Sequence, residues 1–200
     1  MTERAAGRKK IAGVLCLILL GFSFVLAQDM MVPSIVQYRL FLKILSYDRN
    51  LASTMGKELV IGILYQSGFR TSFRAMEGFQ EAVQTTPQKE FEKISVRSVA
   101  IDLDKESDLE KALNDKKIDV VYLTPLRAYE IKVIASLSRA KKMITLTGVP
   151  EYAEKGIVVG VGMKGESPEI IINLPAAREA GSDFSSSLLK LARVIENSPE

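Results

Sequence analysis

The 200-residue sequence contains no histidine and a single cysteine, Cys16. A chain without histidine cannot form a Ser-His-Asp triad or a Cys-His pair, and the usual zinc sites are excluded with them. Carboxylate chemistry and oxygen-ligated calcium or magnesium remain open. Because Cys16 lies inside an apolar N-terminal run, we expect no disulfide and no thiol switch in the folded part of the chain.

The N-terminal residues have the pattern of a secretory signal. The basic stretch RAAGRKK precedes the uncharged run IAGVLCLILLGFSFVLA, which is shorter than the about 20 apolar residues of a membrane span. Val25-Leu26-Ala27 then places small residues where a signal peptidase cleaves. We predict a signal peptide over residues 1–27, cleaved after Ala27, and hence an exported protein. An uncleaved N-terminal anchor is the alternative.

The charge balance gives no indication of a nucleic-acid partner. The sequence has 27 basic and 24 acidic residues, of which four basic and one acidic lie in the first 27 residues. The remaining chain, with 23 residues of each sign, is neutral. Nucleic-acid binding requires a basic face, so we expect no nucleic acid among the partners.

Strands and helices alternate through the middle of the chain. Residues 30–50 predict an amphipathic helix that packs on the domain's own sheet, with a partner-binding helix as the alternative. Apolar segments rich in β-formers predict buried strands over residues 58–66, 93–102, 119–125 and 143–148. Between these strands, helices are expected over residues 69–83, 105–117 and 125–139.

This alternation predicts an α/β fold, with a single doubly wound, largely parallel sheet and helices on both of its faces. Residues 156–163 and 168–174 are too close together for a crossover helix, so they predict a C-terminal β-hairpin. A last helix is expected over residues 183–195. We divide the chain into a signal peptide (1–27), an N-terminal helix and linker (28–57) and an α/β domain (58–196).

Two motifs resemble ligand sites but have a simpler interpretation. Residues 160–165 match G-x-G-x-x-G, which binds dinucleotides where a strand leads into a helix, whereas here a second strand follows. Asp102 and Asp104, with Glu106 and Asp108 after them, lack the glycine and terminal glutamate of an EF-hand loop. Acidic residues before a helix complement its dipole. We therefore expect no cofactor and no metal.

Polar residues follow three of the predicted strands. Ser67, Thr124 and Thr147 close the first, third and fourth strands, and ligands of open α/β sheets bind beyond the carboxyl ends of the strands. Arg70 and Arg127 lie just downstream and could hold a small anion with these hydroxyls. The alternative is that the hydroxyls cap helices and stabilise turns.

The C-terminal 40 residues carry the most specific pattern. A glycine-bearing strand and a short turn precede a strand ending in I-N-L, followed by A-A-R-x-A-G and by S-S-x-L-L-x-L-A-x-V. On these residues the chain resembles the YfiR-like (YfiR/HmsC-like) family of periplasmic proteins. Within the pattern, Asn173 is expected to bond the backbone at the strand end, and Arg178 to reach a carbonyl or carboxylate. Gly181 is expected to end a helical turn in a left-handed conformation.

The resemblance implies a non-enzymatic periplasmic signalling regulator. Its expected partner is the periplasmic domain of an inner-membrane sensor, either a diguanylate cyclase or a histidine kinase, and its expected output is cyclic-di-GMP and biofilm control. The resemblance also implies a homodimer. The family namesake is controlled by cysteine oxidation, which cannot apply to a mature chain without cysteine.

Candidate partner contacts lie on two segments. The first is the N-terminal helix, with Tyr38, Phe41 and Tyr47, and the second is the hairpin tip, with Lys164 and Glu166. An alternative function is a one-lobe periplasmic small-ligand-binding protein that uses the crevice at the strand ends. Carboxylate-based catalysis is a third and weaker alternative.

Overall fold

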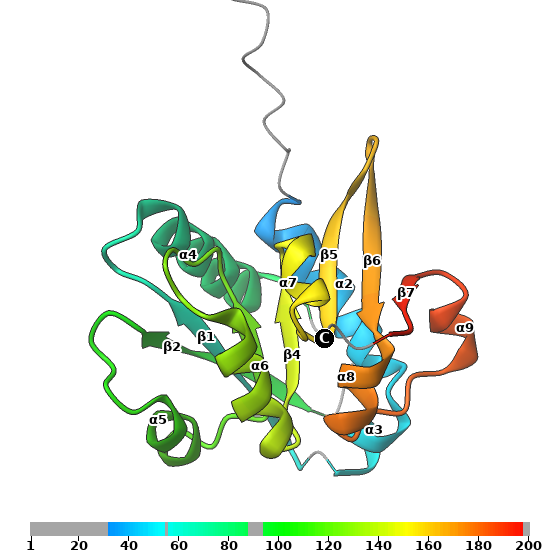
Figure 1. Cartoon of the computed structure of the whole chain (residues 1–200), viewed down its shortest axis with the longest axis horizontal. Coiled ribbons are helices and arrows are strands. Elements are labelled where there is room, and N and C mark those ends of the chain that lie inside the picture. Colours follow the sequence, from blue (N-terminus) through cyan, green and yellow to red (C-terminus); the bar gives the residue numbers. More distant parts are fainter. Residues whose placement is uncertain (1–31, 55, 88–93, 198–200) are drawn as a thin grey trace, which may run out of the picture. The chain divides into compact units, whose positions relative to one another are not determined.

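A seven-stranded sheet with strand order β2-β1-β3-β4-β5-β6-β7 forms the centre of the fold (Figure 1). The computed structural model describes residues 32–54, 56–87 and 94–197, so the predicted signal peptide lies outside the described residues. All neighbouring strands pair in parallel except β5 and β6, which are antiparallel. The predicted α/β class is confirmed. The strands are β1 (Glu58–Tyr65), β2 (Ser95–Asp102), β3 (Val120–Leu123), β4 (Ile144–Thr147), β5 (Val159–Lys164), β6 (Ser167–Asn173) and β7 (Arg193–Ile195).

Helices cover both faces of this sheet, and each face has its own hydrophobic core. Alternate strand residues divide between the two: Ile61 and Ile63 of β1 lie in one core, and Val60 and Leu64 in the other. The first core includes residues of α2 (Ser34–Ser46), α4 (Arg70–Thr85), α8 (Leu174–Glu179) and α9 (Ser186–Leu189). The second includes residues of α5 (Leu109–Asp115), α6 (Ile131–Ala140) and α7 (Pro150–Glu154). The short helix α3 (Arg49–Thr54) follows α2.

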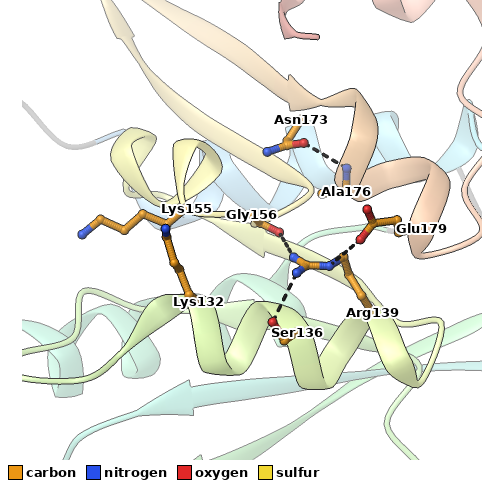
Figure 2. A pocket seen from close by; sticks show the side chains of 8 residues that line it. All are labelled: Lys132, Ser136, Arg139, Lys155, Gly156, Asn173, Ala176 and Glu179. Carbon is orange, nitrogen blue, oxygen red and sulfur yellow. Dashed lines mark hydrogen bonds and ion pairs between the residues drawn. The ribbon is translucent and has the colours of Figure 1, made fainter. Parts of the chain in front are cut away.

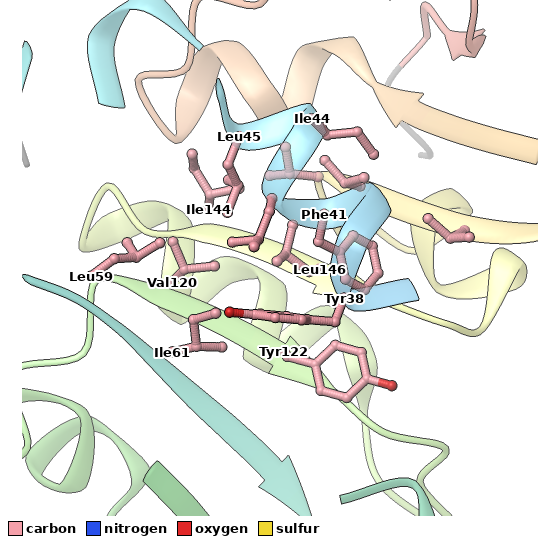
Figure 3. Close-up of a cluster of buried hydrophobic side chains, with 14 of the residues drawn as sticks. Tyr38, Phe41, Ile44, Leu45, Leu59, Ile61, Val120, Tyr122, Ile144 and Leu146 are labelled. Carbon is pink, nitrogen blue, oxygen red and sulfur yellow. The ribbon is translucent and has the colours of Figure 1, made fainter. Parts of the chain in front are cut away.

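Helix α2 packs on the sheet, as the sequence predicted. Tyr38 and Phe41 are fully buried (Figure 3). Phe79 of α4 stacks on Tyr122 of β3 with ring centroids 3.9 Å apart, and the Tyr38 ring meets Phe79 edge-on at 5.6 Å. This aromatic cluster joins the N-terminal helix to the domain core. Within the described ranges, no helix is long and apolar enough to span a membrane.

The predicted hairpin is present, and its outer half extends past its neighbours (Figure 1). β4 pairs with only Val159 and Gly160 of β5, and β7 pairs with β6 only from Ile171 onward. Gly165 lies in the two-residue turn with φ of +62°, a conformation that glycine adopts without strain. Gly162 permits close packing, since a Cβ there would lie 2.5 Å from the Pro150 ring.

The predicted last helix over residues 183–195 is wrong. The chain forms only the single-turn α9, capped by Ser185, and then the strand β7, which pairs in parallel with β6. Phe184 and Leu188 are buried, but Leu191 is 75% exposed, so the apolar residues of this segment do not share one helix face. The open edge of β6 explains the difference, because a strand there satisfies backbone groups that a helix would leave unpaired.

Two further boundaries differ from the prediction. Helix α6 begins at Ile131 rather than at Pro125, and residues 124–130 form a loop in which Ala128 has φ of +51°. Helix α7 was not predicted, although Pro150 at its start is typical of a first helical turn.

Candidate functional site

The hydroxyl groups of Thr124 and Thr147 form hydrogen bonds within the sheet and do not face a crevice. Thr124 and Thr147 are fully buried. The Thr124 hydroxyl donates to the Leu64 carbonyl at 2.9 Å, and the Thr147 hydroxyl donates to the Leu123 carbonyl at 3.0 Å. The expectation that these two hydroxyls face a ligand cavity is therefore corrected, because each bonds the end of the neighbouring strand.

The loop after β1 is held in place by the acidic loop after β2. The Ser67 N–H donates to Asp102 at 3.0 Å, and the Gly68 N–H donates to Asp104 at 2.7 Å. Asp102 also pairs with Lys105 at 3.0 Å. Partial burial alone raises the pKa of Asp102, but the hydrogen bonds from Lys105 and Ser67 outweigh it and hold the pKa below its ordinary value. Asp102 and Asp104 thus hold the loop after β1 against the loop after β2.

A second contact joins this loop to the loop after β3. The Gln66 side chain donates to Asp104 at 3.1 Å and accepts the Arg127 N–H at 2.7 Å. The Arg127 guanidinium lies over the Phe69 ring, 4.5 Å from its centroid. Of the predicted ligand contacts, Arg127 therefore lies against Phe69, and Arg70 follows Phe69 in the sequence.

Aromatic rings continue along the exposed side of α4. Phe73 lies one turn after Phe69 and is 36% exposed, and its ring centroid is 6.1 Å from that of Tyr65. Burial and the neighbouring Asp102 raise the pKa of the Tyr65 phenol above its ordinary value. The sequence predicted only that Phe69 and Phe73 lie on a helix and Tyr65 on a strand, because periodicity does not show where the sheet edge ends and solvent begins.

A groove of about 430 Å³ separates the starts of α2 and α4. Arg70 and Arg74, one helical turn apart, line it together with Thr71 and with Ser34 and Gln37 of α2. Among the described residues, neither arginine makes an ion pair. The groove is accessible to an anionic group, and Arg70 is the one predicted ligand contact that lines it.

A smaller cavity of about 150 Å³ lies between α6, the end of α7 and α8 (Figure 2). Arg139 crosses it, with its guanidinium paired to Glu179 at 2.8 Å and bonded to the Gly156 carbonyl and the Ser136 hydroxyl. Since these bonds connect α6 to α8 and to the loop before β5, the polar groups of this cavity hold the domain together. Across the ranges that the structure describes, no group of carboxylates could hold a metal ion.

The predicted partner contacts divide into buried and accessible residues. Tyr38 and Phe41 have no exposed surface, which corrects their assignment as contacts: their rings are required in the core. Tyr47 is half-buried beneath the Lys43 ammonium, 5.5 Å from the ring centroid. Lys164 and Glu166 are exposed at the hairpin tip.

Two residues of the C-terminal signature, Asn173 and Gly181, have structural roles after β6. The Asn173 side chain accepts the Ala176 N–H at 2.9 Å and donates to the Ala153 carbonyl at 2.8 Å, so it caps α8 and ties it to α7. Gly181 has φ of +82°, as expected for the end of that turn. Arg178 is exposed on α8.

The architecture is shared with solved α/β structures. The similar chains include a domain in complex with L-Trp from Streptococcus pneumonia (17% identity, TM-score 0.57), a conserved domain protein from Vibrio cholerae (15%, 0.57) and a ligand-free substrate-binding protein with adhesive properties from Clostridium difficile (14%, 0.57). The matches cover 82%, 82% and 84% of this chain but only 62%, 60% and 61% of those chains. At these identities the likeness shows the fold alone.

The sequence itself identifies the family. The model of the YfiR/HmsC-like family matches residues 36–193, which run from the first turn of α2 to the first residue of β7. The chain belongs to the YfiR/HmsC-like family. No curated protein matches the sequence.

Proposed function

We propose that the protein is a non-enzymatic periplasmic regulator. It binds the periplasmic domain of an inner-membrane sensor, a diguanylate cyclase or a histidine kinase, and changes the sensor's output. The observation that carries this proposal is membership of the YfiR/HmsC-like family over residues 36–193. The internal bonding of Thr124, Thr147 and Asn173 agrees with it, because these polar groups stabilise the scaffold.

Binding changes the output only through a difference in affinity for the sensor's two states. A tenfold difference corresponds to about 1.4 kcal/mol, which a few well-packed contacts supply. The accessible candidates from the sequence, Tyr47 and the hairpin residues Lys164 and Glu166, remain proposals for such contacts.

The proposal is tested by affinity capture from inner-membrane extract with the chain of residues 28–200, followed by mass spectrometry. The expected result is recovery of a membrane sensor that has a periplasmic domain. Chains carrying Tyr47→Ala, or Lys164→Ala with Glu166→Ala, then show whether either candidate segment contributes. Sedimentation of the same chain tests the homodimer that the family resemblance implies.

A one-lobe small-ligand receptor is the second candidate function. The groove between α2 and α4 favours it, because Arg70 and Arg74 would bind a carboxylate or phosphate there. Native mass spectrometry of the purified chain distinguishes the two. A co-purifying small molecule, together with no captured sensor, would favour the receptor.

A further inference from the structure

Three arginines that carry no ion pair in the described part of the chain lie around one end of α4. Arg49, Arg97, Arg139 and Arg193 each pair with a carboxylate of the same chain. In contrast, Arg70, Arg74 and Arg127 are exposed and have no such partner among the described residues, which is also true of Arg39 on α2 and Arg178 on α8. Their charges are therefore available to another molecule.

Aromatic rings lie among these charges. Arg127 stacks on Phe69 at 4.5 Å, Arg70 follows Phe69 directly, and Phe73 precedes Arg74. Phe73 is one of the few large apolar side chains exposed in the described structure, at 36%. Arginine and aromatic residues are enriched at the energetically dominant positions of protein interfaces. We call the six residues Tyr65, Phe69, Arg70, Phe73, Arg74 and Arg127 the arginine–aromatic surface.

This surface is held rigid by the loops beneath it. Asp102 and Asp104 accept the N–H groups of Ser67 and Gly68, immediately before Phe69. Gln66 accepts the Arg127 backbone N–H and so holds the loop after β3 beside the loop that carries Phe69. A surface that is ordered before binding loses little conformational entropy on association.

The local carboxylates do not neutralise the three arginines. Asp102 is paired with Lys105, and Asp104 accepts bonds from Gly68 and Gln66. Glu77 is exposed on α4 three residues after Arg74 and makes no ion pair with it in the described structure. The remaining charge selects a negatively charged occupant, and the exposed Phe73 ring favours one that also presents apolar atoms.

We propose that the arginine–aromatic surface is the docking site for an acidic segment of the sensor's periplasmic domain. Carboxylates of that segment would bind Arg70 and Arg74 in the groove beside α2, and an apolar side chain would pack on Phe73. This inference rests on the proposed function and adds the surface and the partner's chemistry to it.

The test measures binding of the 28–200 chain to the purified periplasmic domain of the captured sensor. Replacing Arg70, Arg74 and Arg127 together with glutamate is expected to weaken binding by at least about 100-fold at low salt. Phe73→Ala is expected to weaken it by about tenfold. The matched controls, Arg178→Glu and Val133→Ala on the exposed sides of α8 and α6, should stay within about twofold. Binding by the triple variant with wild-type affinity would overturn the assignment.

A photo-crosslinking side chain placed at position 73 or at position 133 provides a second measurement that does not depend on charge reversal. Crosslinks from position 73 to an acidic segment of the sensor are expected, and crosslinks from position 133 alone would refute the surface. If the wild-type chain captures no sensor, the proposed function is wrong. If it binds a sensor and the substitutions leave the affinity unchanged, only the assignment of the surface is wrong. Arginine-dependent thermal stabilisation by inorganic phosphate, with sensor binding unchanged in the triple variant, would reassign the groove to a small anion.

Discussion

The hydroxyl groups of Ser72 and Thr124 lie 2.6 Å apart in the interior, between α4 and the end of β3. The Thr124 hydroxyl donates to the Leu64 carbonyl, so the Ser72 hydroxyl donates to Thr124 and itself accepts the Gln66 N–H. This directed chain of bonds begins and ends on the backbone at the end of β1. It explains why Thr124, which the sequence assigns to a ligand crevice, instead fixes the backbone that leads into the arginine–aromatic surface.

Disrupting that chain of bonds should destabilise the fold cooperatively. Thr124→Val leaves the Ser72 hydroxyl without its acceptor, and Ser72→Ala leaves the Gln66 N–H unpaired, so each should lower the free energy of unfolding by about 1–3 kcal/mol. Urea unfolding of both single variants and the double variant should give a double-variant loss smaller than the sum. The exposed Thr85→Val serves as control. Strict additivity would show that the two hydroxyls do not interact.

The N-terminal helix should contribute to stability through Phe41. Phe41→Ala removes a fully buried ring and is expected to cost about 3–5 kcal/mol of unfolding free energy. Phe73→Ala, at a ring that is 36% exposed, should cost less than about 1.5 kcal/mol. Thermal denaturation followed by circular dichroism compares the two. Equal losses would contradict the packing of α2 on the sheet.

The buried Tyr122 should make stability fall in alkali. Burial raises the pKa of its phenol well above the ordinary value near 10, whereas the unfolded chain keeps the ordinary pKa. Above pH 10 the unfolded state loses this proton first, so the free energy of unfolding falls by about 1.4 kcal/mol for each pH unit.

The Tyr122→Phe variant isolates this effect, because the raised pKa values of Tyr65 and Tyr152 are common to both proteins. At pH 7 the variant should be less stable by about 1–2 kcal/mol, since the Gln37 side-chain oxygen loses the Tyr122 donor. The difference in unfolding free energy between the variant and the wild type should fall to zero between pH 10 and about pH 11. A difference that stays constant up to pH 11.5 would show that Tyr122 is accessible to solvent.

Asn173 should be required for the junction between β6, α7 and α8. Asn173→Ala removes the bonds to Ala176 and Ala153 and should cost about 2–4 kcal/mol of unfolding free energy. Arg178→Ala, at an exposed position of the same signature, should change it by less than about 0.5 kcal/mol. Chemical denaturation measures both, and a neutral Asn173→Ala would remove the structural explanation of the signature.

Periodicity in the sequence was sufficient to predict the sheet and most of its helices. The strand Glu58–Tyr65 is apolar almost throughout because both of its faces are buried, and the close spacing of β5 and β6 left only a hairpin. The apolar run of β1 and the short connection between β5 and β6 are each visible in a few consecutive residues, so the sequence alone predicts them. The C-terminal signature identified the family, on which the proposed function rests and which composition and periodicity could not indicate.

The features that the sequence did not predict depend on neighbours distant along the chain. Residues 193–195 form a strand because β6 has an open edge beside them, although their spacing fits a helix. Thr124 points to Leu64 and Ser72 rather than outward, which only the pairing of β1 with β3 determines. Arg127 and Phe69 meet because Gln66 joins the two loops.

The regulatory function is tested most directly by the output of the captured sensor, reconstituted in lipid nanodiscs, with and without the 28–200 chain. If the protein is a regulator, a saturating amount of the chain changes the rate of cyclic-di-GMP synthesis or of autophosphorylation at least severalfold. The variant with glutamate at positions 70, 74 and 127 should have no effect at the same concentration. A sensor whose rate is unchanged while the wild-type chain is bound would contradict the proposal that the protein is a regulator.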